Sequence, residues 1–184
     1  MWATVVNRDG VVCAVVFSGT NRSAQWPGSR VISAQKANTA NAFSLDATSS
    51  SNGSGQAKGL ALSTANLYSA VQPGGSLYGL QHSNPVDTDA AYEAGGSTAF
   101  GTTGDPMFNR AAGGVNVFGG GLGLYASGGR LVGGVGVSGD ATRPDNIVFD
   151  ITDNPAGGSG VSKGGFGHPK CLNTGDPSSL PAVR

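Results

Sequence analysis

Residues 113–139, GGVNVFGGGLGLYASGGRLVGGVGVSG, decide the fold that this sequence predicts. Glycine turns separate short apolar runs, a pattern that predicts three strands, two of them over 121–125 and 131–138. Because successive side chains of a strand point to opposite faces, the glycines of these two strands share one face. They are Gly121, Gly123, Gly134 and Gly136.

One face of the predicted sheet therefore lacks side chains, while Leu131, Val135 and Val137 are expected on the opposite face. Glycine weakens the interior of a strand, and its presence there often marks the close approach of a ligand or of another backbone. We therefore expect something flat or tightly packed to cover this bare face.

The composition excludes several classes of protein. The chain has 184 residues, which suits one domain with an appendage. Eleven basic residues balance eleven acidic ones and charged residues make up 12%, so the basic patch of a nucleic-acid-binding protein is absent. No apolar run approaches about 20 residues, which argues against a membrane span. Residues 1–20 lack the order of a signal peptide, and the sequence assigns no compartment.

A β-hairpin is predicted at the start of the chain. Two apolar, β-branched runs cover 2–7 and 11–17, and Asp9-Gly10 between them is a strong turn signal. Cys13 lies within the second run and is expected to be a small core residue.

A helix is predicted over 30–44, with Ser29 as its N-cap. At 100° per residue the helix has a stripe of small side chains, which permits close packing on a neighbour. These residues are Ser33, Ala37, Ala40 and Ser44. An adjoining stripe of the helix combines polar and apolar side chains. It contains Ser29, Ile32, Lys36, Thr39 and Phe43.

The remaining segments differ in composition. Residues 46–59 predict a flexible loop, and 60–72 fit a second short helix. Residues 84–112 are polar and rich in turn residues, which predicts a long connecting loop. We assign 1–150 to one domain and expect 151–184, rich in Gly, Pro and Ser, to be an irregular tail.

Known catalytic and metal-binding motifs are incomplete. Residues 134–139, GVGVSG, match G-x-G-x-x-G, but Pro144 falls where the phosphate-binding helix would run. His168 and Cys171 supply half of a zinc site without the other half. Two free thiols are favoured, although a disulfide between Cys13 and Cys171 is an alternative.

Two polar residues have alternative interpretations. His82 is either an exposed histidine or an axial ligand to haem iron, for which a neutral imidazole is suited. Lys36 shares a helix face with Ile32 and Phe43. It is either a lysine whose stem covers apolar surface or a cation that pairs with a ligand carboxylate.

Four segments in order along the chain resemble the GlcG/HbpS-like family. The family pattern is a D-x-x-G-type turn, then S-x6-K-A-x-T-A on a helix, then G-G-x-P-[IV], then G-x-[IV]-G-V-S-G. The matching segments are spread in order over most of 2–140. They are Asn7-Arg-Asp-Gly10, Ser29 to Ala40 with Lys36-Ala-Asn-Thr39-Ala40, Gly113-Gly-Val-Asn-Val117, and Leu131-Val-Gly-Gly-Val-Gly-Val-Ser-Gly139.

The resemblance implies an α+β domain with a five-stranded antiparallel sheet, similar to profilin-like and PAS-like folds. It also implies self-association, and some members bind haem while others are encoded with glycolate metabolism. The chain departs from the pattern at Asn116, where proline is frequent, and it begins at the first strand where members begin with a helix. One sheet face or edge would then lack a cover, which again favours a symmetric homo-oligomer.

The leading hypothesis is a non-enzymatic protein that binds haem or another tetrapyrrole. The glycine face and the polar helix stripe would form a pocket wall, with an axial histidine and a lysine for a propionate. The residues assigned to this pocket are His82, Lys36, Ser29, Thr39, Gly134 and Gly136.

Two alternatives belong to other classes. One is an enzyme or accessory protein for a small 2-hydroxy acid such as glycolate, in which Lys36 and Thr39 hold the carboxylate. No general base is evident for it. The other is a structural oligomer without a ligand, in which the small-faced helix covers the glycine face.

Overall fold

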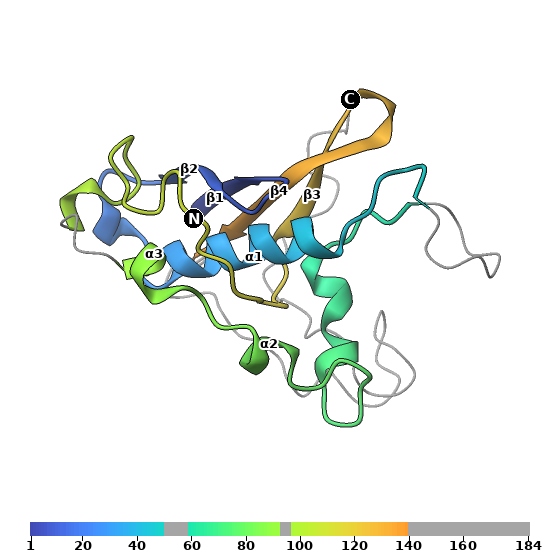
Figure 1. Cartoon of the computed structure of the whole chain (residues 1–184). Helices are drawn as coiled ribbons and strands as arrows, with labels where there is room; N and C mark the ends of the chain where they lie inside the picture. The colour runs from blue at the N-terminus through green and yellow to red at the C-terminus, as the bar shows by residue number, and fades with distance from the viewer. Residues whose placement is uncertain (50–58, 93–96, 140–184) are drawn as a thin grey trace, which may run out of the picture. The chain divides into compact units, whose positions relative to one another are not determined.

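Four strands form one antiparallel sheet with the order β2-β1-β4-β3 (Figure 1). The computed structural model describes residues 1–49, 59–92 and 97–139. These residues belong to a compact unit that spans Met1–Asp140. The strands are β1 (Trp2–Asn7), β2 (Val12–Phe17), β3 (Gly121–Ala126) and β4 (Arg130–Ser138). Within these residues the sheet thus has four strands rather than the five that the family resemblance implies.

The turn at Asp9-Gly10 joins β1 and β2 as predicted. Gly10 has a φ of +80°, a conformation that glycine adopts readily. The Asn7 side-chain oxygen accepts hydrogen bonds from the backbone N–H groups of Asp9 and Val11, each 3.0 Å long. The turn is therefore held by its own sequence.

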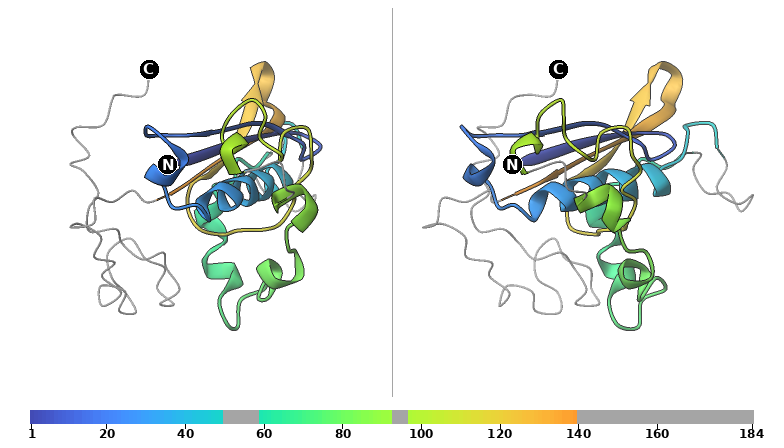
Figure 2. Two further views of the ribbon diagram at one scale, coloured as in Figure 1. Left: turned by 90° about the vertical axis from the view of Figure 1, so that its left-hand side faces the viewer. Right: turned by 60° about the vertical axis from the view of Figure 1, so that its left-hand side comes forward.

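Helix α1 (Ser29–Phe43) covers one face of the sheet (Figures 1 and 2). It matches the helix predicted over 30–44, but Ser29 is not its cap. The N-cap is Gly28 and no side chain caps the helix. The reason is local: the N–H of Ser29 already donates to the Trp26 carbonyl, and the helix begins one residue earlier than expected.

The glycine face lies directly beneath α1. A methyl group added to Gly136 would overlap the carbonyl oxygen of Ser33, and one added to Gly134 would overlap that of Ala37. The hydroxyl groups of Ser33 and Thr4 are hydrogen-bonded at 2.7 Å in the same interface. The predicted packing of the small-residue stripe on the bare sheet is therefore confirmed.

The stretch 113–139 forms two strands rather than three. Residues 113–118 run along α1 instead of joining the sheet. The side-chain amide of Asn38 donates to the Gly114 carbonyl (2.8 Å), and the N–H of Asn116 donates to Thr39 Oγ1 (2.9 Å). Helix side chains take the hydrogen bonds that a neighbouring strand would have made.

Leu131 faces the helix side, contrary to the expectation that it would share a face with Val135. The pairing register of β3 and β4 shifts between Leu124 and Tyr125. Such an irregularity reverses the alternation of side chains beyond it. Leu131 is consequently buried and packs against Gly123.

The segment after α1 contains short helical turns rather than the single helix predicted over 60–72. The Ser63 and Asn66 side chains each accept a hydrogen bond from the other's backbone N–H, and a 3-10 turn begins at this point. The short helices are η1 (Arg22–Ala24), η2 (Thr64–Leu67), η3 (Ser69–Val71), α2 (Leu80–Ser83), α3 (Thr88–Tyr92), η4 (Ser97–Ala99) and η5 (Ser127–Gly129).

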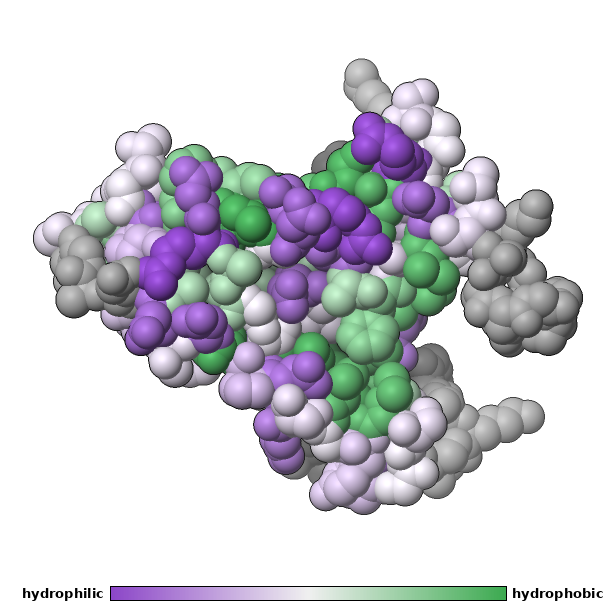
Figure 3. All heavy atoms as spheres, in the orientation of Figure 1, coloured by the Kyte–Doolittle hydropathy of each residue, from purple (hydrophilic) through white to green (hydrophobic). Residues whose placement is uncertain are grey.

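Buried apolar side chains form two clusters. The larger joins α1 to β1 and β2 and centres on Trp2, Val6 and Val31. The smaller joins the 62–71 segment to Val115 and Val117, with Leu80 partly buried beside it. On the face drawn in Figure 3, hydrophobic side chains gather below α1, over the region of α2 and the 60–80 segment.

Cys13 is exposed rather than part of the core. Val12 and Val15 are the residues of β2 that turn inward, because the pairing of β1 and β2 shifts register between Val5 and Val6. Among the described residues, no helix combines the length and the apolar character needed to cross a membrane. The predicted tail, the domain boundary at 150, most of the 46–59 loop, His168 and Cys171 lie outside the described residues.

Candidate functional site

The ammonium group of Lys36 is the centre of the candidate site. Lys36 lies in the middle of α1, and the residue is 6% exposed. Its Nζ atom donates a hydrogen bond to the Val137 carbonyl oxygen of β4 at 3.0 Å. A side chain at Gly120 would come within 3.4 Å of the same nitrogen. Backbone therefore borders the ammonium on the sheet side.

Burial lowers the pKa of Lys36 from 10.5 to about 8, because desolvation disfavours the charged form. In the described part of the chain the one ion pair joins Arg30 to Asp105, so no carboxylate there neutralises Lys36. An ammonium has three N–H donors, and one carbonyl oxygen satisfies one of them. The group is thus suited to receive an anion, which would raise its pKa again.

Thr39 is engaged in structure rather than available to a ligand. Its hydroxyl donates to the Gln35 carbonyl at 2.7 Å and accepts the N–H of Asn116 at 2.9 Å. The bond from Asn116 fastens the 113–118 segment to α1. A proline at 116, which the family pattern favours, has no N–H and could not form it.

Ser29 is fully buried at the first residue of α1, and its Oγ atom has no hydrogen-bond partner among the described residues. A buried polar group without a partner costs free energy and calls for a local explanation. Ser29 and Lys36 are separated by seven residues, about 10 Å along a helix axis. They therefore do not hold the same group of a small ligand.

His82 lies on α2, on the opposite side of α1 from the sheet (Figures 1 and 2). Its side chain is exposed. Gly134 and Gly136 face the helix from the sheet side, and α1 fills the space above them. The structure thus brings Lys36 together with Gly136 but separates both from His82. The six predicted residues do not form one pocket wall.

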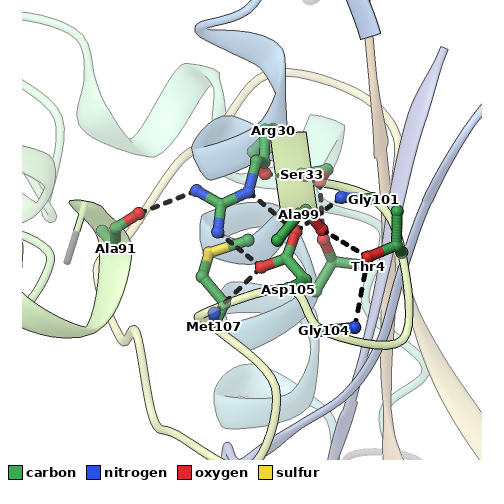
Figure 4. A network of polar contacts seen from close by, with 10 residues as sticks. Thr4, Arg30, Ser33, Ala91, Ala99, Gly101, Gly104, Asp105 and Met107 are labelled. Atoms are coloured by element: carbon green, nitrogen blue, oxygen red, sulfur yellow. Dashed lines mark hydrogen bonds and ion pairs between the residues drawn. The ribbon is translucent and has the colours of Figure 1, made fainter. Parts of the chain in front are cut away.

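The sequence analysis missed a buried polar network at the start of α1. The guanidinium of Arg30 donates to both carboxylate oxygens of Asp105, at 2.9 and 2.5 Å, and to the Ala91 carbonyl at 2.8 Å (Figure 4). It also lies 3.9 Å from the centre of the Phe100 ring. Arg30 and Asp105 are 75 residues apart, and no local pattern pairs them.

Asp105 is held in place from its own loop. Its carboxylate accepts the N–H groups of Gly101 (2.7 Å) and Met107 (2.9 Å), so both oxygens have backbone and guanidinium partners (Figure 4). This network fixes the 99–107 loop to α1. The residues that the structure describes contain no group of three His, Cys, Asp or Glu side chains suited to a metal ion.

Comparison with known proteins shows a structural similarity. The sequence matches no protein-family model and no curated protein. The chain is similar to the crystal structure of the Klebsiella pneumoniae protein ORFY, of the DUF336 family, with 26% identity and a TM-score of 0.42. The match covers 76% of this chain, and the chain spans 63% of the length of that protein.

Proposed function

We propose that this chain is a ligand-binding domain of the GlcG/HbpS type that holds a ligand carboxylate through Lys36. The observation that carries the proposal is the buried ammonium, which has one carbonyl partner and no carboxylate partner among the described residues. A charge-assisted bond to a carboxylate is worth roughly 1.5–3 kcal/mol. The ordered motifs of the sequence support the family assignment.

A small 2-hydroxy acid such as glycolate is the first ligand that we propose for Lys36. Lys36 is 6% exposed, so a compact carboxylate reaches it more readily than a group attached to a large ring. The proposed role is binding, and we assign no catalytic residue.

Haem or another tetrapyrrole is the second proposed ligand, supported by the family resemblance. The exposed imidazole of His82 would ligate iron at the surface, next to the smaller apolar cluster that includes Leu80. Gly134 and Gly136 would take no part, because α1 covers them. The proposed carboxylate site at Lys36 and the proposed iron site at His82 are different sites, and a different experiment tests each.

Calorimetry at two pH values tests the Lys36 proposal with glycolate as the probe. Because the pKa of free Lys36 is about 8 and a bound carboxylate raises it, binding at pH 8 should take up protons. Titrations in two buffers of different ionisation enthalpy measure this uptake. Affinity should fall as the pH rises through 8, and both effects should vanish in Lys36→Met. Binding that is unchanged in Lys36→Met contradicts the proposal.

Titration with hemin decides the second ligand. Binding through His82 predicts a Soret band whose position changes in His82→Ala. Gln81→Ala is a poor control because Gln81 accepts the N–H of Val117; the exposed Ser83 of the same helix offers Ser83→Ala instead. An identical Soret band in the parent and in His82→Ala rejects the axial assignment.

We also propose that the chain self-associates. On the strands β2 and β3, Val16 and Leu122 are 54% and 53% exposed, and exposed apolar side chains on a sheet favour burial against a partner. Light scattering at micromolar concentration tests this, and a monomeric mass contradicts it.

A further inference from the structure

A cavity of about 180 Å³ lies beside the first turn of α1, and Lys36 does not line it. Aromatic and apolar side chains form most of its wall, and two arginines border it. The lining includes Trp2, Arg22, Pro27, Arg30, Tyr92 and Phe100. Its volume is below the roughly 300 Å³ at which pockets for drug-sized ligands begin. The cavity is thus suited to a small molecule.

Trp2, one of the residues that line this cavity, has an unsatisfied hydrogen-bond donor. The residue is 1% exposed, and its indole Nε1 has no partner among the described residues. An indole N–H can only donate. The indole ring also packs against Phe17, with ring centres 5.0 Å apart. The donor therefore calls for an acceptor atom that the described protein does not supply.

The two arginines make the cavity electropositive. Arg22 is half-buried and forms no hydrogen bond or ion pair with any described residue. Arg30 uses three of its five N–H donors on Asp105 and Ala91. Asp105 compensates one of the two positive charges and leaves the other without a counter-charge.

We propose that this cavity binds a small monocarboxylate with an apolar body. The carboxylate oxygens would accept from the indole N–H of Trp2 and pair with the guanidinium of Arg22, while the apolar body would lie against Pro27 and Phe100. An anion without an apolar part would leave the apolar side chains of the cavity in contact with water. A neutral apolar molecule would leave the indole N–H and the guanidinium unpaired, which costs affinity.

Tryptophan fluorescence provides a local measurement. The chain contains two tryptophans, Trp2 and Trp26, and Trp26 is 62% exposed. In a Trp26→Phe background, Trp2 is the one indole reporter. Titration with benzoate should give a saturable change in its emission. Benzamide, which has the same shape without the charge, should bind roughly tenfold more weakly or worse.

Arg22→Gln in the same background should weaken benzoate binding by about tenfold or more. The matched control is Arg130→Gln, which removes one exposed arginine at the start of β4 and should change binding less than about twofold. Arg22→Lys keeps the charge and should recover part of the affinity.

Three results would overturn the proposal. They are the absence of a saturable change with benzoate, equal affinity for benzamide, and an equal loss in Arg22→Gln and Arg130→Gln. Each of them is read from Trp2, so the outcome does not depend on whether Lys36 binds glycolate.

Discussion

Helix α1 carries two buried cations whose surroundings differ. Arg30, near the start of the helix, has two carboxylate oxygens, a carbonyl oxygen and an aromatic ring as partners. Lys36, two turns later, has one carbonyl oxygen. Burial lowers the pKa of Lys36 to about 8.

The difference separates a cation that holds elements of the fold together from one for which we propose a ligand. Arg30 joins α1 to α3 and to the 99–107 loop, so its partners are the fold itself. Lys36 keeps unused donors beside bare backbone at Gly120. Removing the partner of Arg30 should therefore destabilise the fold. Replacing Lys36 should instead alter the pH dependence of stability.

The largest effect is expected from removing the partner of Arg30. Asp105→Asn keeps the size of the side chain but leaves a buried guanidinium without a counter-charge, which should lower the free energy of unfolding by about 3–5 kcal/mol. Urea denaturation measures it. Asp89→Asn, at an exposed position of α3, is the matched control and should cost less than about 0.5 kcal/mol. Equal effects of the two variants would contradict the structural role of the pair.

A smaller effect is expected directly after Lys36, where α1 touches the glycine face. Ala37 is fully buried and its carbonyl lies over Gly134. Ala37→Leu should overpack this contact and lower the free energy of unfolding by about 1–3 kcal/mol. Ala42→Leu places the same side chain on an exposed position of the same helix. Equal melting temperatures of the two variants would contradict the close packing of Ala37 on the sheet.

The smallest effect concerns Lys36 and depends on pH. In the folded protein its pKa is about 8, below the value of 10.5 expected of an unperturbed lysine. Between these values the unfolded chain binds more protons, so the free energy of unfolding rises with pH across this window. We expect a rise of about 1 kcal/mol, because partial solvation moderates the effect.

The comparison variant for this effect is Lys36→Met, which has a side chain of similar length without a charge. Its unfolding free energy should lack this contribution between pH 8 and pH 10, while tyrosines and the other groups titrate alike in both proteins. Parallel curves for the parent and Lys36→Met would show that Lys36 is not desolvated.

Local signals predicted the parts of the fold that rest on nearby residues. Asp9-Gly10 predicted the first hairpin because its turn needs a glycine with positive φ, and Gly10 has it. The contact of the helix with the glycine face was predicted because two complementary periodic patterns coincide. The helix predicted over 60–72 was wrong, because this segment forms two short 3-10 turns. The Thr64 hydroxyl bonds to Phe118 and Gly121, contacts more than 50 residues away that no local pattern specifies.

The candidate site was predictable only in part. Lys36 was singled out from its place on a mixed helix face, and the structure shows that it is buried; its role as a ligand-binding residue stays a prediction. His82 and the glycines were grouped with it because sequence order does not reveal on which side of a helix a distant segment packs. The cavity beside Trp2 gave no signal, because its lining comes from five separate segments between residues 2 and 100.

The sequence by itself determined the hairpin, the helix over 30–44 and the side-chain-free sheet face, since each depends on turn geometry or on the periodicity of neighbouring residues. Tertiary structure decided which cation is paired. Arg30 meets Asp105 across 75 residues of chain, and Lys36 meets Val137 across 101. Such contacts follow from how the 99–107 loop and β4 pack on α1, and no local pattern specifies them.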